Sequence, residues 1–470
     1  MTQARAASYG APLSLPAILA FACTSIPISA LILAVAVHLP RYFASHLGMS
    51  LVVVGGAFAL VRAIDIPLDP MLGLVMDRTR SRFGRYRLWT VIGAPVVMGA
   101  LYMLISAGPG TGQLYLIGWL LVMYLGLSIL LLSHLAWAAT LAPTYNQRSR
   151  IFGVLTAVGV TGATMVLLIP VIAASQGYTD AQGVQAMVWF IIAAAPITVA
   201  VAVWRTPERI TQDHETRFRL RDYWALLTRP NILRILAADL FVTLGPGWMA
   251  ALYLFFFKDS RGFTTTQANL LLMIYILAGF VGAPLAAWLA NRFSKHRALM
   301  INTTIYSVVL VTLILLPKGQ FLAAAPVMFI LGAMAAGFTV MIRALTADIG
   351  DEIRLESGRE WMGLLYAMTN ATTKVAGAAS IFLTFNVLAA VNYNAAEGAT
   401  NSAATIRGLE LAYMIGPVVF VMLGGACFFG YKLNAKRHAE IRTELEARDA
   451  LYDEAPVLEG LTGEPGGVSR

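Results

Sequence analysis

The sequence predicts an all-α integral membrane protein with twelve membrane-spanning helices, arranged as two related six-helix halves. Three observations predict this fold. Of the 470 residues, 58% are apolar and only 13% are charged, the apolar residues fall into twelve long runs, and one residue pattern recurs in both halves. Soluble domains carry about 25% charged residues, so this chain must turn its outer surface toward lipid.

Each apolar run is long enough to cross a bilayer, which takes about 20 residues of helix. In hydrocarbon every backbone amide must be hydrogen-bonded within its own segment, so the runs are predicted to be helices rather than strands. The twelve runs leave no room for a separate soluble domain. Their expected bounds are 14–39, 48–76, 88–107, 112–141, 151–175, 185–204, 232–257, 266–291, 298–317, 321–347, 360–391 and 409–433.

Basic residues mark one side of the membrane. Five arginines follow the second run and six lie between the sixth and seventh runs, whereas the loops 106–113 and 174–183 contain no Lys or Arg. Because Lys and Arg concentrate in cytoplasmic loops, both termini are predicted to be cytoplasmic. The net charge of +9 therefore indicates topology rather than nucleic-acid binding.

The long basic connection in the middle of the chain divides the expected halves. The predicted parts are a cytoplasmic N-terminus (1–13), a first half (14–204), a middle loop (205–231), a second half (232–433) and a charged, partly disordered tail (434–470). The first apolar run lacks the features of a cleaved signal peptide, so we expect it to remain as a span. The two cysteines lie apart in apolar runs, which excludes a disulfide framework and a zinc site.

A repeat supports the division into halves. Pro70 precedes Arg78 by eight residues at the end of the second run, and Pro284 precedes Arg292 by the same interval at the end of the eighth. Six-helix repeats with a binding site at their interface are a transporter architecture.

The second run contains charges that are costly to bury in a membrane. Arg62, Asp65 and Asp69 are spaced by three and four residues, which places them on one helix face. Two neighbouring carboxylates in a low dielectric need a cation, so Asp65 and Asp69 are candidate ligands for Na⁺ or a shared proton. The alternative is that Arg62 forms a structural bridge with Asp65 while Asp69 ends the helix. The repeat-related positions, Gly279 and Ala283, are uncharged, so architecture alone does not demand these acids.

Lys374 lies deep in the eleventh run among small and apolar residues. A buried lysine needs an acidic partner, and the Asp65/Asp69 pair is the expected one, across the interface between halves. A purely structural bridge is the alternative interpretation.

Other polar or aromatic residues in the runs are candidates for a substrate cavity. Asp239 precedes Gly245-Pro246-Gly247-Trp248, where we expect a broken helix. The Asp239 side chain is expected to act in gating, to contact the substrate or to form a bridge between helices. A lone histidine such as His134 is more often packed than a proton relay, and tryptophans offer apolar stacking faces. The candidate cavity residues are Thr24, Ser25, Ser133, His134, Trp137, Asp239, Trp248 and Arg343, the last more structural in character.

One dense motif carries a family resemblance. It reads Arg62-x2-Asp65-x3-Asp69-Pro70-x2-Gly73-x3-Asp77-Arg78-Thr79-Arg80-Ser81-Arg82-x-Gly84-Arg85, and a second reads Ala347-Asp348-x2-Asp351-Glu352-x5-Gly358-Arg359-Glu360. With the lysine in the eleventh run, these stretches resemble the glycoside-pentoside-hexuronide cation symporters of the major facilitator superfamily, the group that includes melibiose permease.

The resemblance implies a twelve-helix major facilitator fold in which Asp65 and Asp69 bind Na⁺ or a proton near Lys374. The sequence departs from the family at the sugar site. Its first and fourth runs offer hydroxyls and a histidine, whereas sugar carriers of the family have acidic residues on the corresponding helices. The cargo is thus open between a sugar or glycoside, an anionic solute and a lysolipid. The expected cytoplasmic gate comprises Asp77, Arg78, Arg80, Arg85, Asp348, Asp351 and Glu352.

The resulting hypothesis is a secondary active symporter of the bacterial inner membrane, monomeric, with no cofactor beyond its coupling ion. A proton-coupled exporter is the alternative within the transporter class. The sequence has no Walker loop, HExxH or Ser/His/Asp grouping, which speaks against an enzyme, and its tail is too short for a sensor's output domain.

Overall fold

The computed structural model describes residues 13–79, 81, 83–141, 145–206, 208, 226–358, 361–433 and 435–453. Twelve helices in this part are long and apolar enough to cross a membrane, as predicted. The spans are Leu15–His46, Leu51–Met76, Tyr86–Ile105, Gln113–Leu141, Arg150–Ser175, Asp180–Arg205, Pro230–Ser260, Thr265–Phe293, Lys295–Leu315, Phe321–Ser357, Leu364–Ala390 and Ala403–Ala426.

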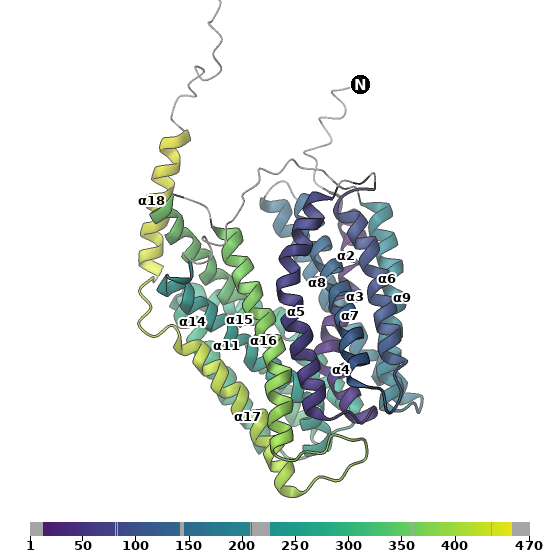
Figure 1. The fold of residues 1–470 in the computed structure, drawn as a ribbon. Coiled ribbons are helices and arrows are strands. Elements are labelled where there is room, and N and C mark those ends of the chain that lie inside the picture. The colour runs from purple at the N-terminus through teal and green to yellow at the C-terminus, as the bar shows by residue number, and fades with distance from the viewer. Residues whose placement is uncertain are drawn as a thin grey trace, which may run out of the picture.

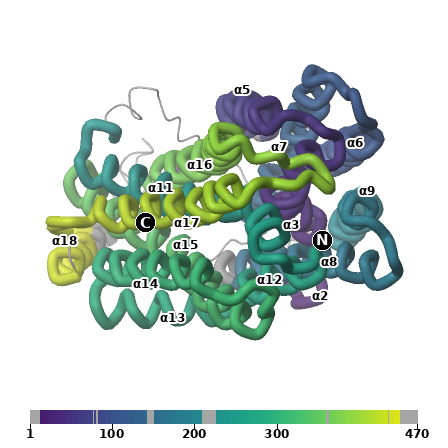
Figure 2. Tube along the Cα trace, turned by 90° about the horizontal axis from the view of Figure 1, so that it is seen from below, coloured from purple at the N-terminus to yellow at the C-terminus, as the bar shows by residue number. Residues whose placement is uncertain are grey.

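The first six spans pack together on one side of the molecule in Figures 1 and 2. Their elements are α2 (Leu15–Ala22), α3 (Ser25–Leu33), η1 (Ala34–His38), α4 (Leu39–Arg41), η2 (Tyr42–His46), α5 (Leu51–Arg78), α6 (Tyr86–Ile105), α7 (Gln113–Leu141), α8 (Tyr145–Ser175) and α9 (Asp180–Arg205).

The last six spans form the other side. Their elements are α11 (Pro230–Phe255), η3 (Phe256–Ser260), α12 (Thr265–Leu277), α13 (Gly279–Phe293), α14 (Lys295–Leu315), α15 (Phe321–Ser357), α16 (Met362–Ala390) and α17 (Ala403–Ala426), followed by α18 (Ala435–Asp453). The two sides meet chiefly where α5 contacts α16 and where α8 contacts α12. We call the end that carries α18 and the start of α2 the terminal face, and the other the opposite face (Figure 1).

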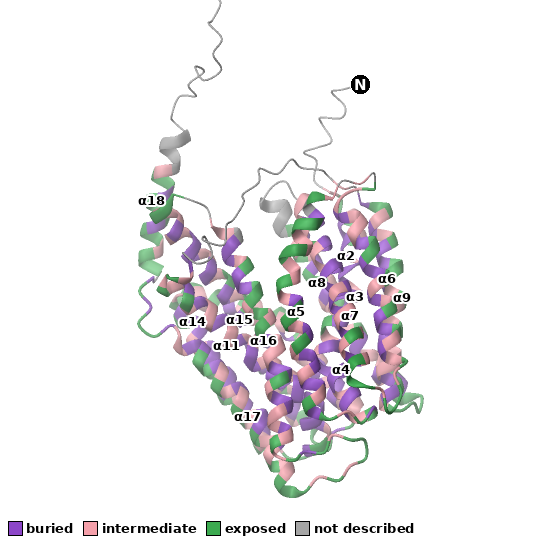
Figure 3. Cartoon of the chain, in the orientation of Figure 1, coloured by how far each residue is buried: buried purple, intermediate pink, exposed green. Residues whose placement is uncertain are grey.

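The outer surface is apolar, as a lipid-facing surface must be. On α5, for example, Leu60, Met71 and Leu74 are exposed, and Figure 3 shows exposed residues along α5 and α17. Large aromatic side chains fill the interior, among them Trp137, Tyr253 and Phe385, each less than 2% exposed.

The repeat extends to backbone detail. The first and seventh spans both end in a π-helical turn, η2 and η3, which is an uncommon element. A left-handed glycine follows each turn, Gly48 with φ 67° and Gly262 with φ 69°. A hydroxyl then caps the next helix, from Ser50 and Thr264. These paired positions have the same separation in sequence as Pro70 and Pro284, so the structure agrees with the repeat seen in the sequence.

One expectation about the helices was wrong. The seventh span is a continuous α-helix through Pro246, from Pro230 to Phe255, and is not broken there. The flanking glycines serve close packing instead. A Cβ on Gly245 would lie 2.5 Å from Val421 Cγ2, and a Cβ on Gly247 would lie 3.0 Å from Ser380 Oγ. The glycines therefore allow α11 to approach α17 and α16.

The charged tail forms the helix α18, and it docks on the terminal face. Ile441 and Leu445 of α18 are each 1% exposed. His438 Nε2 lies 3.2 Å from Asp348 Oδ1 and 3.1 Å from Asp351 Oδ2, both on α15. The helix thus joins the last six spans through apolar and charged contacts; the disorder predicted beyond it falls outside the described residues.

Candidate functional site

The predicted acid pair and lysine come together in the structure. Lys374 of α16 lies with its Nζ 3.0 Å from Asp65 Oδ2, and it also contacts Asp69 Oδ2. Arg62 Nη1 lies 3.1 Å from the same Asp65 oxygen. The cluster joins α5 in the first six spans to α16 in the last six, at the contact visible in Figure 2.

Two acids and two bases balance each other in this cluster. Asp65 is 1% exposed, and the Asp69 and Lys374 side chains are each 20% exposed. The desolvation cost of burying an ion is offset only when its ion-pair partner and its hydrogen bonds are in place. Ser128 Oγ of α7 donates to Asp65 Oδ1 at 2.9 Å, which satisfies the second oxygen of that carboxylate.

Asp69 is less completely satisfied. Its Oδ1 is buried and has no hydrogen-bond partner among the described residues. A buried acceptor of this kind is costly to leave unpaired. Residues Pro67 and Pro70, both inside α5, lack the N–H that would bond to the carbonyls of Ala63 and Ile66. The helix that carries the acid pair therefore has two carbonyl oxygens without their helical donors, and oxygen atoms are the ligands that hard cations prefer.

The structure bears on the structural alternative for the acid pair. Arg62 does bridge to Asp65, and its guanidinium lies 4.2 Å from the centre of the Tyr124 ring, so it is held in place on both sides. The alternative that Asp69 ends the helix is wrong, because α5 continues to Arg78. Asp69 faces Lys374 instead.

The polar candidates of the first six spans form one buried cluster. Ser25 Oγ lies 3.2 Å from His134 Nε2, and the His134 ring stacks on Phe21 with centroids 4.4 Å apart. Thr90 donates to Ser133 Oγ at 2.9 Å. His134 Nδ1 is buried without a partner among the described residues.

The two remaining candidates of this cluster have packing contacts. Thr24 Oγ1 donates to the carbonyl of Thr198 at 3.4 Å. Trp137 is fully buried, with its ring edge-on to Phe21 at 5.1 Å between centroids. Both therefore lie inside the packing of the first six spans.

The candidates of the last six spans lie apart from that cluster. Trp248 is buried and donates from Nε1 to the Ala412 carbonyl at 2.9 Å, so it packs α11 on α17. Asp239 is 7% exposed and accepts hydrogen bonds from two threonines of α16. Arg343 of α15 is exposed and interacts electrostatically with Asp239 without forming an ion pair.

The three acids of the expected gate on α15 have partners on their own side of the molecule. Asp348 lies 2.5 Å from Lys295, Asp351 contacts His438, and Glu352 accepts from Asn231 at 2.7 Å. Of the arginines, Arg78 is exposed and Arg85 donates its backbone N–H to Glu208 at 2.9 Å. Arg80 and the side chain of Asp77 lie outside the described residues.

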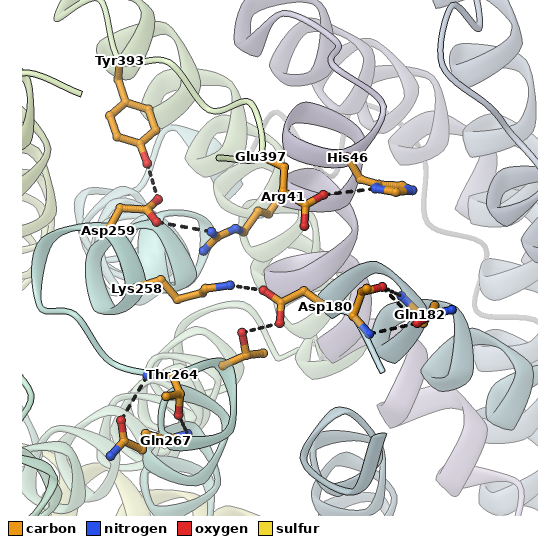
Figure 4. A network of polar contacts seen from close by, with 12 residues as sticks. Arg41, His46, Asp180, Gln182, Lys258, Asp259, Thr264, Gln267, Tyr393 and Glu397 are labelled. Atoms are coloured by element: carbon orange, nitrogen blue, oxygen red, sulfur yellow. Dashed lines mark hydrogen bonds and ion pairs between the residues drawn. The ribbon is translucent and has the colours of Figure 1, made fainter. Parts of the chain in front are cut away.

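A charged network at the opposite face, drawn in Figure 4, was not predicted from the sequence. Arg41 Nη2 lies 3.6 Å from Asp259 Oδ1, and Lys258 contacts Asp180. A more exposed pair joins His46 to Glu397 at 3.3 Å. All three pairs join the first six spans to the last six or the loop between α16 and α17. Charged residues at the ends of the spans were the available signal, for example Asp180, which lies in the loop 174–183 without Lys or Arg.

Burial shifts the pKa values of two side chains around this network, Tyr393 and Arg261. Tyr393 donates to Asp259, and its burial together with that carboxylate raises the pKa of its hydroxyl. Burial lowers the pKa of Arg261, whose Nη2 lies 3.3 Å from Glu410. A cavity of about 380 Å³ lies within the network, and His38, Arg41 and Ser45 are among its lining residues.

The twelve-span architecture, with a charged cluster between its two sides, defines a membrane transporter of the major facilitator type. The comparisons agree: residues 20–435 match the family described as MFS/sugar transport protein. That match covers most of the chain, which therefore belongs to this family.

Two relatives and one solved structure illustrate the relationship. The inner membrane symporter YicJ of Escherichia coli (strain K12) is 24% identical over 87% of this chain and 88% of its own length. A lactose permease of Lactobacillus delbrueckii subsp. bulgaricus is 26% identical over 83% of this chain and 65% of that protein. The crystal structure of the nucleoside transporter NupG aligns with a TM-score of 0.64 at 14% identity, covering 88% of this chain and all of that one (100%). The structural likeness bears out the expected fold.

Proposed function

We propose that this transporter carries a sugar or glycoside together with a cation, Na⁺ or H⁺, across the bacterial inner membrane. The observation that supports it best is the acid pair Asp65 and Asp69 closed by Lys374. The Lys374 ammonium occupies the position that a free cation would take. The coupling ion and this ammonium therefore compete for the same two carboxylates.

The cation would take the place of Lys374 at Asp65 and Asp69. The Asp69 Oδ1 atom has no partner among described residues, and Ser128 Oγ lies next to the pair, so both are candidate additional ligands. When the ion binds, Lys374 is released from α5, and the contact between α5 and α16 loosens. Coupling requires only that this changed state bind the substrate more tightly.

The charged network at the opposite face supports an inward-facing state. In the part of the chain that the structure describes, the ion pairs between the two sides lie at the acid pair and at the opposite face, and those of the terminal face remain within one side. With the terminal face in the cytoplasm, the periplasmic end is latched. The gate acids Asp348, Asp351 and Glu352 would then exchange partners when the carrier turns outward.

The proposal for the cargo rests on the relatives and on the polar cluster. One relative is named a lactose permease and another an isoprimeverose transporter. Ser25, Ser133 and His134 provide neutral donors and acceptors that match sugar hydroxyls. Because the described cluster contains no acid, we expect a neutral or weakly anionic sugar to bind by hydrogen bonds alone.

The remaining features of the proposal follow the sequence. We propose two six-helix halves, 14–204 and 232–433, that rock about a central site, with both termini in the cytoplasm and the chain acting as a monomer. We expect no enzymatic activity and no resident cofactor.

Uptake into proteoliposomes by the double variant Asp65→Asn/Asp69→Asn tests the coupling site. We expect cation-dependent uptake to fall to the level of empty liposomes, while substrate exchange without a gradient persists, because the amides preserve shape but cannot hold a cation. Glu446→Gln, an exposed acid on α18, is the matched control. Uptake by the double variant that still follows an imposed Na⁺ or H⁺ gradient would contradict the proposal.

A further inference from the structure

A second buried acid lies next to the ion-pair cluster without belonging to it. Asp239 of α11 is 7% exposed and lies within the span Pro230–Ser260. It is nine residues beyond Pro230, about 14 Å along the helix at 1.5 Å per residue. A carboxylate at such depth needs a partner, a cavity or a function.

The groups that surround Asp239 include no ion-pair partner. No Lys, Arg or His nitrogen of the described residues lies within ion-pair distance of its carboxylate. Arg343 of α15 acts on it from farther away. From α17 the neighbour is Gly424, whose added Cβ would lie 3.3 Å from the Ala238 carbonyl. The elements η1 and α4 meet α11 at its other end, where Arg41 lies over Phe255.

Two hydroxyls of α16 face one oxygen of this carboxyl group. Thr372 Oγ1 contacts Asp239 Oδ2, and Thr373 Oγ1 lies 3.1 Å from the same oxygen. Thr372 Oγ1 is also 2.7 Å from the carbonyl of Thr369. A hydroxyl has one proton, so Thr372 cannot donate to the carboxyl and to the carbonyl at once.

Counting protons gives two complete arrangements. If Asp239 is ionised, Thr372 and Thr373 both donate to Oδ2. If Asp239 is protonated on Oδ2, its O–H donates to Thr372, and Thr372 donates to the carbonyl of Thr369. Hydrogen bonds are available to the carboxyl group in either state, so the site can gain or lose a proton without any backbone movement.

Architecture does not require an acid here. At the separation that relates Gly48 to Gly262, the position matching Asp239 is Ser25 in α3. The equivalent helix of the first six spans therefore packs with a neutral side chain. The acid is a special feature of α11.

We propose that Asp239, with Thr372 and Thr373, forms a proton-binding site separate from Asp65 and Asp69. The proton exchanges with water, and the only bond that forms or breaks is the O–H bond on the carboxyl group. The ligand is thus a single proton, held by one carboxyl oxygen between two hydroxyls.

The position of the site couples it to the ion-pair cluster, an aspect that rests on the proposed function. Thr372, Thr373 and Lys374 are consecutive on α16, and the two threonines face α11 while Lys374 faces α5. Release of Lys374 from α5 shifts this turn of helix. Any loss of the Thr373 hydrogen bond destabilises the ionised carboxylate, so a proton binds to Asp239.

Infrared difference spectra of the purified full chain between high and low pH test the site. We expect a protonated-carboxyl C=O band that Asp239→Asn removes and that Asp259→Asn, an acid of the opposite face, leaves in place. In Thr373→Val, the ionised form loses one hydrogen bond, and the midpoint of this band should rise by about one to two pH units. Thr384→Val is the control, because the Thr384 hydroxyl lies within hydrogen-bond distance of two carbonyls of its own helix, those of Ser380 and Ile381, and not of Asp239.

The outcomes separate the two proposals. A spectrum that Asp239→Asn does not change at any pH, or a Thr373→Val midpoint equal to that of wild type, overturns the proton site. If instead Asp239→Asn removes the band while Asp65→Asn/Asp69→Asn retains gradient-driven uptake, the proton site stands and the proposed coupling site fails. Addition of the coupling cation should shift the band in wild type and leave it unshifted in that double variant.

Discussion

Removing Lys374 turns a balanced cluster into an excess of negative charge. In Lys374→Ala, Arg62 is the remaining cation for Asp65 and Asp69. The Asp69 carboxylate then loses its ion pair while its Oδ1 is already without a partner among the described residues. A cation from solution no longer competes with the Lys374 ammonium, so we expect Lys374→Ala to bind the coupling cation more tightly than wild type and to transport less.

The size of the effect follows from the geometry. At 3.0 Å and an effective dielectric constant of about 20, the Coulomb energy between Lys374 Nζ and Asp65 Oδ2 is roughly 5 kcal/mol. Desolvation of the lysine and the remaining Arg62 reduce the net value, and breaking a buried pair typically costs about 3–5 kcal/mol. We take about 3 kcal/mol, which corresponds to a roughly 150-fold lower Kd for the cation.

The assay is thermal unfolding of purified protein against increasing NaCl, with choline chloride to hold ionic strength, repeated at several pH values. Lys374→Ala should unfold at lower temperature than wild type without the cation and recover at a much lower cation concentration. Lys295→Ala, which removes a lysine paired with Asp348 on the terminal face, controls for general loss of a cation. Equal or weaker cation affinity in Lys374→Ala would refute the reasoning, because it would mean that Lys374 assists rather than competes with the ion.

Two further predictions concern conformation and packing. Arg41→Ala breaks the part-exposed pair with Asp259 and should favour the outward-facing state, measured as several-fold faster labelling of a cysteine placed in the 394–401 loop. Unchanged labelling would show that the pair does not latch this end. Gly332→Ala should lower the unfolding temperature by several degrees, because its Cβ would lie 1.9 Å from the Tyr275 carbonyl oxygen. Gly99→Ala is the control and should be neutral, because its Cβ would meet nothing within 4 Å. Equal changes in unfolding temperature for the two variants would contradict the packing argument.

The sequence was most informative where a rule of membrane chemistry applied to single residues. Charges are rare inside the spans, so Asp65, Asp69 and Lys374 could be paired before any coordinates were known, and the structure brings them together. The twelve spans followed from apolar length alone. Both predictions depend on the cost of exposing polar groups to lipid, which acts locally along the chain.

Predictions that required three-dimensional packing were less successful. Gly245-Pro246-Gly247 suggested a broken helix, yet α11 is continuous because the glycines are needed for contact with α16 and α17. The network of Arg41 and Asp259 was missed because its members are far apart in sequence and each sits at a span end, where single charges are common. The partner of Asp351 proved to be His438 in the tail, which no local pattern could reveal.

The charge balance of the ion-pair cluster has a consequence for energy use. With Asp65 and Asp69 matched by Arg62 and Lys374, the empty carrier has no net charge at this site to move through the membrane field. Each coupling cation adds one positive charge, and a full crossing is worth about 2.3 kcal/mol per 100 mV. The membrane voltage would then drive the loaded carrier inward while the empty carrier returns freely, so accumulation of the solute would depend on voltage as well as on the ion gradient.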